Sequence, residues 1–318
     1  MGSRDDSAGA YPQRRVVAPA ARVAVVAVEG GEAARRRDPV TSSVWVNGAL
    51  AASDTAQLSA FDHGVLVGDG VFETLGVYGG VPFAWTRHDA RLRRSAAGLG
   101  LAVPDRDVLR VAADAVLEAN GIEQGRLRIT VTGGPSPLGS ERGDAPPTVI
   151  VAAAPARPRP DHEAVVTVPW PKNERGATAG LKTISYAENV RALAFAHERG
   201  ATEAVFANTR GELCEATGSN VWVVRDGAVC TPPATAGCLL GVTRALVLEL
   251  GPSAGVPVEE RTLPLAALAR ADEAFLTSST REIVAIAAVD ETRLRAPGEQ
   301  TRALARAFTE LVAANLDP

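Results

Sequence analysis

The segment 181–220 constrains the fold of this chain more than any other part of its 318 residues. It follows a loop of small residues, 176–180, which lets the backbone pass close to a bound group. A helical pattern at about 187–199 comes next, and a β-rich run follows at 203–206. We therefore expect alternating helices and strands here, with the small-residue loop beside a binding site.

Two residues of this segment could carry chemistry together. Lys182 lies at its start and Glu215 near its end. A desolvated lysine with a lowered pKa attacks aldehydes, and a carboxylate can keep a pyridine nitrogen protonated, so the pair suits pyridoxal 5'-phosphate (PLP). A buried carboxylate with no cation beside it would be costly, and a protonated ring nitrogen would satisfy Glu215. Glu212 is a rival, but it adjoins the turn 209–211 and is expected to face solvent.

Three blocks of sequence resemble the class IV (fold-type IV) PLP enzymes. They are FDHGVLVGDGVFET (61–74), GLKTISYAENV (180–190) and ELCEATGSNVW (212–222), with weaker echoes in LLGVTR and FLTSSTREI. This family includes 4-amino-4-deoxychorismate lyase, D-amino-acid transaminase and branched-chain aminotransferase. The resemblance implies an α/β fold with a small N-terminal and a larger C-terminal domain, the cofactor between them, and a homodimer.

The resemblance also implies roles for individual residues. Lys182 would bind the cofactor covalently and move protons, Glu215 would pair with the pyridine nitrogen, and Tyr186 would donate to the phenolic oxygen unless it is only a buried aromatic. Phosphate contacts are expected from Arg91, Gly241, Val242, Thr243, Ser279 and Thr280, although both turns could be plain loops. Candidate substrate contacts are Phe72, Thr74, Arg142 and Arg281, and either arginine could instead be a surface charge.

The chain is long enough for two domains, and 46% of its residues are hydrophobic. We expect a variable extension over 1–42, a small α/β domain over 43–154, a proline-rich linker over 155–161 and a larger α/β domain over 162–318. The turn Asn47-Gly48 predicts a hairpin, and Thr86 with Asp89 predicts the capped start of a helix. Further helices are expected at 105–120, 242–250 and 302–315, with strands at 71–78, 126–132, 148–153, 165–168, 221–224, 256–261, 273–277 and 283–289.

Composition argues against several other classes of protein. The net charge is −4 and the pI is near 5.7, which gives no general attraction to nucleic acid or to an anionic membrane. No run of about 18 apolar residues is present. The three cysteines show neither C-x-x-C spacing nor neighbouring histidines, so we expect reduced cysteines, no metal site and a cytoplasmic location. His63 and His88 are expected to be packing or surface residues.

Three functions remain open. The favoured one is 4-amino-4-deoxychorismate lyase, because lyase-like members carry a small hydroxyl at the position of Thr74. The second is a transaminase for D-amino acids, branched-chain amino acids or amines. Branched-chain enzymes usually carry FEG where this chain has FET (72–74), and no arginine–histidine carboxylate trap is visible in TVTGGPSPLGSERG (130–143). The third, a silent PLP-binding homologue, would need a broken lysine or glutamate.

Overall fold

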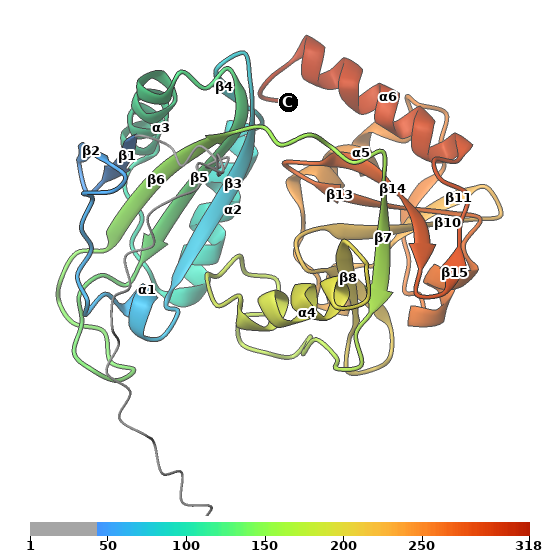
Figure 1. Cartoon of the computed structure of the whole chain (residues 1–318), viewed down its shortest axis with the longest axis horizontal. Coiled ribbons are helices and arrows are strands. Elements are labelled where there is room, and N and C mark those ends of the chain that lie inside the picture. The colour runs from blue at the N-terminus through green and yellow to red at the C-terminus, as the bar shows by residue number, and fades with distance from the viewer. Residues whose placement is uncertain (1–42) are drawn as a thin grey trace, which may run out of the picture. The chain divides into compact units, whose positions relative to one another are not determined.

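The structure is a computed structural model that describes residues 43–318, so the predicted extension over 1–42 lies outside the described residues. Two β-sheets, each packed against helices, make up the described part (Figure 1). This mixed α/β fold agrees with the predicted α/β class.

The first sheet is antiparallel throughout and has the strand order β2-β1-β6-β5-β3-β4. Helix α2 packs on β3, and α3 packs on β1 and β6. Leu75, Leu92, Leu109 and Leu127 are fully buried between sheet and helices. The elements are β1 Ser43–Val46, β2 Ala49–Ala52, α1 His63–Leu66, β3 Gly70–Tyr78, β4 Val81–Pro82, α2 Trp85–Leu99, α3 Arg106–Asn120, β5 Gln124–Thr132 and β6 Thr148–Pro155.

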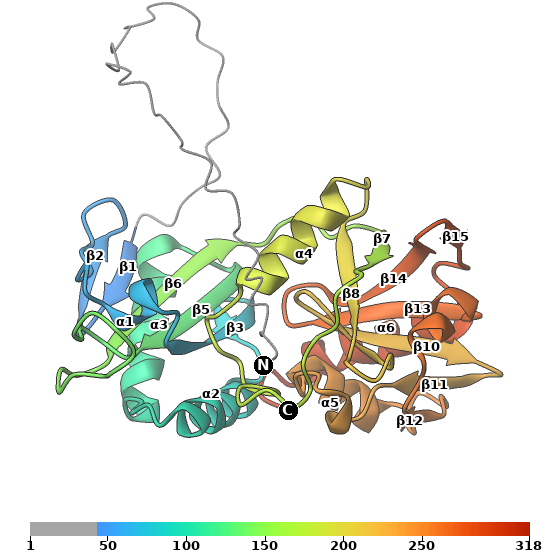
Figure 2. The ribbon, with the colours of Figure 1, turned by 90° about the horizontal axis from the view of Figure 1, so that it is seen from below.

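The second sheet is mixed and has the order β12-β11-β10-β13-β14-β7-β8-β9, with β15 paired to β14. Strand β7 runs parallel to both β8 and β14, while most other pairs are antiparallel. Helix α4 packs on β8, α5 on β13, and α6 on β13 and β14 (Figure 2). The elements are β7 His162–Thr167, α4 Ala187–His197, β8 Glu203–Ala207, β9 Leu213–Ala216, β10 Asn220–Arg225, β11 Ala228–Thr231, α5 Val242–Leu250, β12 Val258–Glu260, β13 Glu273–Ser278, β14 Glu282–Val289, β15 Thr292–Arg293 and α6 Glu299–Ala314, with short 3-10 turns at Ala234–Ala236 and Leu265–Arg270.

The predicted start of the second helix is wrong. Helix α2 begins one residue earlier, after Ala84, which has a φ of 52° and gives no side-chain cap. The Thr86 hydroxyl bonds Asp317 instead of capping the helix, and the N–H of Ala84 donates to Leu316 at 2.7 Å. Residues at the far end of the chain thus fix this helix start, so no local sequence pattern could reveal it.

The predicted hairpin is confirmed, and the predicted linker needs one change. Asn47 and Gly48 both have positive φ angles between β1 and β2. Pro155 ends β6 instead of opening the linker, because the next N–H, from Ala156, continues the ladder to Gln124 at 3.0 Å.

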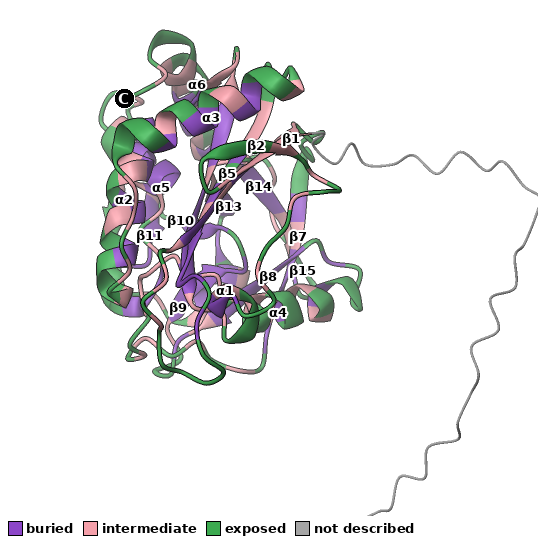
Figure 3. Ribbon diagram, turned by 90° about the vertical axis from the view of Figure 1, so that its left-hand side faces the viewer, coloured by how far each residue is buried: buried purple, intermediate pink, exposed green. Residues whose placement is uncertain are grey.

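An apolar cluster ties the edge of the first sheet to the helices of the second. Phe83 and Ala84 pack there with Val242, Leu246 and Phe308. In Figure 3, the strands β10 and β13 are buried, whereas much of the outer surface of the helices is exposed. The start of α5 is therefore held close to β3 and α2, and these are elements that line the cavity described next.

Candidate functional site

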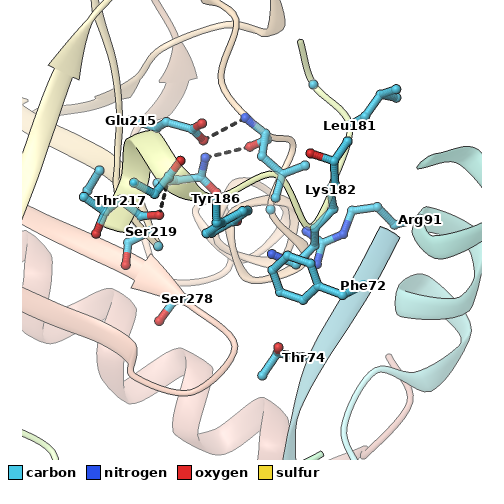
Figure 4. Close-up of a pocket in the computed structure, with 18 of the residues that line it drawn as sticks. Phe72, Thr74, Arg91, Leu181, Lys182, Tyr186, Glu215, Thr217, Ser219 and Ser278 are labelled. Carbon is cyan, nitrogen blue, oxygen red and sulfur yellow. Dashed lines mark hydrogen bonds between the residues drawn. The ribbon is translucent and has the colours of Figure 1, made fainter. Parts of the chain in front are cut away.

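A cavity of about 610 Å³ is lined by residues from both sheets (Figure 4). Most of the predicted site residues line it, although they come from distant parts of the sequence. Those present are Phe72, Thr74, Arg91, Lys182, Tyr186, Glu215, Gly241, Val242, Thr243, Ser279 and Thr280. Arg142 and Arg281 are not among the lining residues.

Lys182 is held by its backbone between the first sheet and α2. Its N–H donates to the Ser95 hydroxyl at 3.1 Å, and its carbonyl accepts from the N–H of Phe72 at 3.0 Å. Its Nζ lies 4.2 Å from the centre of the Phe72 ring, and no carboxylate in residues 43–318 pairs with it. Burial, reinforced by the charge of Arg91, lowers the pKa of Lys182 to about 8. About a tenth of this amine is then neutral at pH 7, far more than for an ordinary lysine, which suits it to act as a nucleophile and a base.

Glu215 lies on β9 and is only 7% exposed. Its Oε1 pairs with the ammonium group of Lys172, and its Oε2 accepts the N–H of Leu239 at 2.8 Å. A protein cation therefore lies beside this carboxylate, in addition to the ring nitrogen that is expected to face it. Glu212 belongs to a separate network, since it pairs with Arg210 and does not line the cavity.

Lys172 was missed in the sequence analysis, although a signal was available. Lys172 and Lys182 are the only lysines in the sequence, and both line the cavity. Burial lowers the pKa of Lys172, but the Glu215 carboxylate outweighs that effect and holds the pKa above its usual value. Lys172 thus stays charged, which leaves Lys182 as the reactive amine.

The start of α5 offers backbone N–H groups to an anion. Gly241 precedes the helix without a side-chain cap, and Val242 and Thr243 form its first turn. A Cβ on Gly241 would lie 2.1 Å from Oδ1 of Asn220, so the backbone can approach here only as glycine. Uncapped N–H groups at a helix start suit a phosphate.

Arg91 reaches the same end of the cavity from α2. Its Nε and Nη2 each donate to Glu73 at 2.7 Å, and its Nη1 donates to the carbonyl of Leu240 at 3.2 Å. Glu73 is buried, and the Arg91 charge overcomes the cost of that burial and keeps the pKa of Glu73 well below its usual range. The carboxylate therefore fixes the guanidinium, which retains further N–H groups for an anion.

The two other predicted arginines, Arg142 and Arg281, form ion pairs and do not line the cavity. Arg142 pairs with Asp69, with two contacts of 2.6 Å. Arg281 donates to Glu163 at 2.9 Å, to Glu203 at 2.6 Å and to the Ser219 hydroxyl at 2.5 Å. Since two buried carboxylates depend on Arg281, the structure does not offer it to a substrate.

A different arginine, Arg128, lies at the cavity and was missed. It is on β5 directly opposite Thr74 of β3, and its guanidinium carbon lies 3.7 Å from the centre of the Phe72 ring. Its Nε donates to Thr130 at 3.1 Å, and no carboxylate of the described chain pairs with it. The alternation of side chains along β5, which puts Arg126, Arg128 and Thr130 on one face, was the sequence signal for it.

Hydroxyls and small residues dominate the remaining cavity wall. Hydroxyl-bearing residues on it are Thr74, Thr178, Thr183, Ser185, Thr217, Ser219, Thr277 and Ser278. Two of these hydroxyls donate to other protein groups, Ser185 to the Gly68 carbonyl and Thr217 to Glu203. Tyr186 packs edge-on against Phe72, with ring centres 5.1 Å apart, and burial raises its pKa. This wall suits a polar ligand better than a branched aliphatic one.

Comparison with known proteins agrees with this geometry. Residues 70–289 match the family model described as amino-transferase class IV. D-alanine aminotransferase of Listeria innocua is 32% identical, over 78% of this chain and 87% of its own length. Aminodeoxychorismate lyase of Bacillus subtilis is 31% identical, over 82% of this chain and 92% of its own length. The structure of branched-chain aminotransferase from Thermoproteus uzoniensis with norvaline superposes with a TM-score of 0.80 at 27% identity, covering 86% of this chain and 95% of that one.

Proposed function

Because the chain belongs to the class IV aminotransferase family and is a PLP-dependent enzyme, we propose that it is a 4-amino-4-deoxychorismate lyase. The reaction would release 4-aminobenzoate and pyruvate, as in the synthesis of folate. The second candidate is a transaminase that passes the amino group of a D-amino acid, a branched-chain amino acid or an amine to a 2-oxo acid.

The residues of the cavity fit the cofactor. Lys182 would bind its aldehyde carbon, Glu215 would face the ring nitrogen, and Tyr186 would face the phenolic oxygen. The phosphate would lie among Arg91, the first turn of α5 and the turn 279–280. When bound, PLP supplies a ring that accepts the electron pair left when a proton leaves the carbon bearing the substrate amino group.

Lys182 would act as the general base that removes this proton. Its lowered pKa near 8 and its fixed backbone suit that task. In the lyase reaction, loss of the proton and cleavage of the neighbouring carbon–oxygen bond leave an aromatic ring. The departing enolpyruvate gains a proton as it becomes pyruvate, so protons balance and no second substrate is required.

The observation that carries the lyase proposal is the polar substrate wall formed by Arg128, Thr74 and the hydroxyls around them. Arg128 has no carboxylate partner in the described residues, so a substrate carboxylate would pair with it. The substrate of the lyase carries a ring carboxylate and an enolpyruvyl carboxylate. A branched aliphatic side chain would gain little from these groups.

A transaminase remains the second candidate, because D-alanine aminotransferases are as similar to this chain as the lyase relative is. In that reaction Lys182 would first remove a proton and then deliver it again, and no leaving group would depart. Lys182 would therefore be the base in both reactions. Which reaction follows would depend on whether the bound substrate carries a leaving group.

The deciding experiment supplies 4-amino-4-deoxychorismate without any 2-oxo acid and follows 4-aminobenzoate and pyruvate. D-alanine, L-alanine and L-leucine with 2-oxoglutarate are assayed in parallel. We expect equal amounts of the two lyase products. Arg128→Met should raise KM by about tenfold or more, since a charge-assisted contact is lost. Arg225→Met, at an exposed arginine outside the cavity, is the matched control. Turnover only in the presence of a 2-oxo acid would replace the lyase by the transaminase.

We also propose a cytoplasmic homodimer. Each chain would be divided into 43–155 and 162–318, because Pro155 belongs to β6. No helix in residues 43–318 combines the length and apolar character that a membrane span needs.

A further inference from the structure

We propose that His88 is a positioning residue that takes up a proton when the cofactor phosphate binds, with Ser279 as the link between them. The inference rests on the proposed function, because that proposal places the phosphate beside the start of α5 and the turn 279–280.

The geometry begins with a buried chain of polar groups. His88 is 2% exposed, and its Nδ1 lies 2.7 Å from Oε2 of Glu73. Its Nε2 lies 3.3 Å from the hydroxyl of Ser279, which lines the cavity. Arg91 shares the same Glu73 carboxylate. The chain thus runs from β3 through α2 to the turn after β13.

Hydrogen-bond chemistry fixes the tautomer of a neutral His88. An ionised carboxylate only accepts, so Nδ1 carries the proton that faces Glu73 at 2.7 Å. The Arg91 Nη2, which can only donate, is 3.5 Å from Nδ1 and makes the weaker contact. Nε2 is then an acceptor, and the Ser279 hydroxyl is the donor in that contact. In this state the single proton of Ser279 points at His88 and away from any other acceptor.

A phosphate dianion at the turn changes this arrangement. Its oxygens accept only, so Ser279 must turn its one proton towards the phosphate to contribute a bond. Nε2 of a neutral His88 would then face a hydroxyl lone pair with no proton between them. A proton taken up by Nε2 restores the contact, because the charged imidazole donates to Ser279 and Ser279 donates to the phosphate.

The charges around His88 favour its protonation when a phosphate binds. Burial is the main cause that lowers the pKa of His88, and Arg91 and Lys182 lower it further, while Glu73 raises it. Asp89, the neighbouring acid on α2, is bonded to Arg93. A bound dianion would offset the two cations and shift the balance towards the charged form.

The turn that carries Ser279 is closely fitted against β3. A Cβ on Gly76 would lie 2.9 Å from the carbonyl oxygen of Ser279, so the glycine allows this approach. The hydroxyl is therefore held beside His88 by backbone packing, and the contact does not depend on a mobile surface loop.

The test uses full-length protein freed of cofactor and two ligands, pyridoxine 5'-phosphate and pyridoxine. Neither has an aldehyde, so Lys182 forms no bond with either ligand. Because Lys182 itself titrates near pH 8 and would respond to the phosphate charge, all titrations are made in a Lys182→Met background. Calorimetric titration near pH 8, in two buffers of different ionisation enthalpy, gives the protons taken up on binding. We expect pyridoxine 5'-phosphate to take up about one proton more than pyridoxine.

The variants separate this role from simple packing. His88→Gln should still bind pyridoxine 5'-phosphate, more weakly, but without the additional proton uptake, and Ser279→Ala should lose most of that uptake. His162→Gln, at an exposed histidine on β7, should behave as the wild type. The sequence has four histidines, so the imidazole NMR signals can be assigned by substitution, and only the His88 signal should shift to the charged position.

The outcomes distinguish the two proposals. If neither ligand binds, the proposed PLP site is wrong. If pyridoxine 5'-phosphate binds without additional uptake, or if the uptake persists in His88→Gln, the site stands and the role of His88 is overturned.

Discussion

At the scale of single residues, the two lysines differ only through their neighbours. Lys172 faces the Glu215 carboxylate and has a raised pKa, whereas Lys182 is partly buried near Arg91 and has a pKa lowered to about 8. The same kind of side chain is thereby an ion-pair partner at one position and is suited to the proposed role of base at the other.

Lys182→Met should stabilise the cofactor-free protein at pH 7. Between pH 8 and the ordinary lysine pKa, the unfolded chain holds a proton that the folded chain has lost, so stability rises with pH in that window. Below pH 8 the penalty is complete and amounts to roughly 2–3 kcal/mol. Urea unfolding at several pH values should show a gain at pH 7 and a smaller dependence on pH from 8 to 10. The same variant should bind PLP without the colour that borohydride removes.

Lys172→Met is the matched control at the other lysine. It should lose stability at pH 7, because it leaves the buried Glu215 carboxylate without its cation. Equal behaviour of the two variants would contradict the assignment of Lys182 as the base.

At the scale of elements, Arg281 fixes the turn between β9 and β10 and is not available to bind a substrate. It joins Glu163 of β7 and Glu203 of β8 to Ser219, which lies in the turn between β9 and β10 and lines the cavity. The turn between β13 and β14 is thus tied to the neighbouring turn before β10, which lines the cavity.

Arg281→Met should cost about 3–5 kcal/mol of folding free energy, because two buried carboxylates lose their cation. Arg142→Met, at a more exposed pair with Asp69, should cost about 1 kcal/mol or less. Denaturant unfolding measures both changes. An Arg281→Met protein of normal stability with only a raised KM would restore Arg281 as a substrate contact.

At the scale of the whole molecule, several large apolar side chains around α1 are exposed. Phe61 is 54% exposed, Val65 is 66% exposed and Leu138 is 74% exposed. Backbone bonds place them near one another, because the N–H of Ser136 donates to the carbonyl of Phe61 at 3.0 Å. Such a patch is expected to be covered by a partner, which supports the proposed homodimer.

Light scattering should give twice the chain mass of 33.0 kDa. Val65→Arg should shift the protein towards the monomer, since burying an unpaired charge in an interface is costly. Val111 on α3 is 68% exposed and away from this patch, so Val111→Arg should remain dimeric. A monomeric wild type, or dissociation by the Val111 variant alone, would contradict the proposal.

Much of the fold could be predicted because it depends on local patterns. The helix expected at 242–250 is α5 as found, and the strand expected at 71–78 is β3 with one more residue. The short elements α1, β9, β11 and β15 were not foreseen, because so few residues carry no periodicity and such elements form against partners. The start of α2 was wrong for a related reason, since residues 316 and 317 hold it.

The sequence alone determined which residues could do the chemistry, since a reactive lysine, a carboxylate and a phosphate-binding turn are recognisable in short motifs around Lys182, Glu215 and Gly241. Only the tertiary structure decided which charged side chains form ion pairs with one another. Arg281 pairs with two buried carboxylates, and Glu215 pairs with Lys172. Arg128 lines the cavity. These outcomes depend on distances between strands that are far apart in the chain, and a side chain's charge does not specify its partner until the fold has placed both.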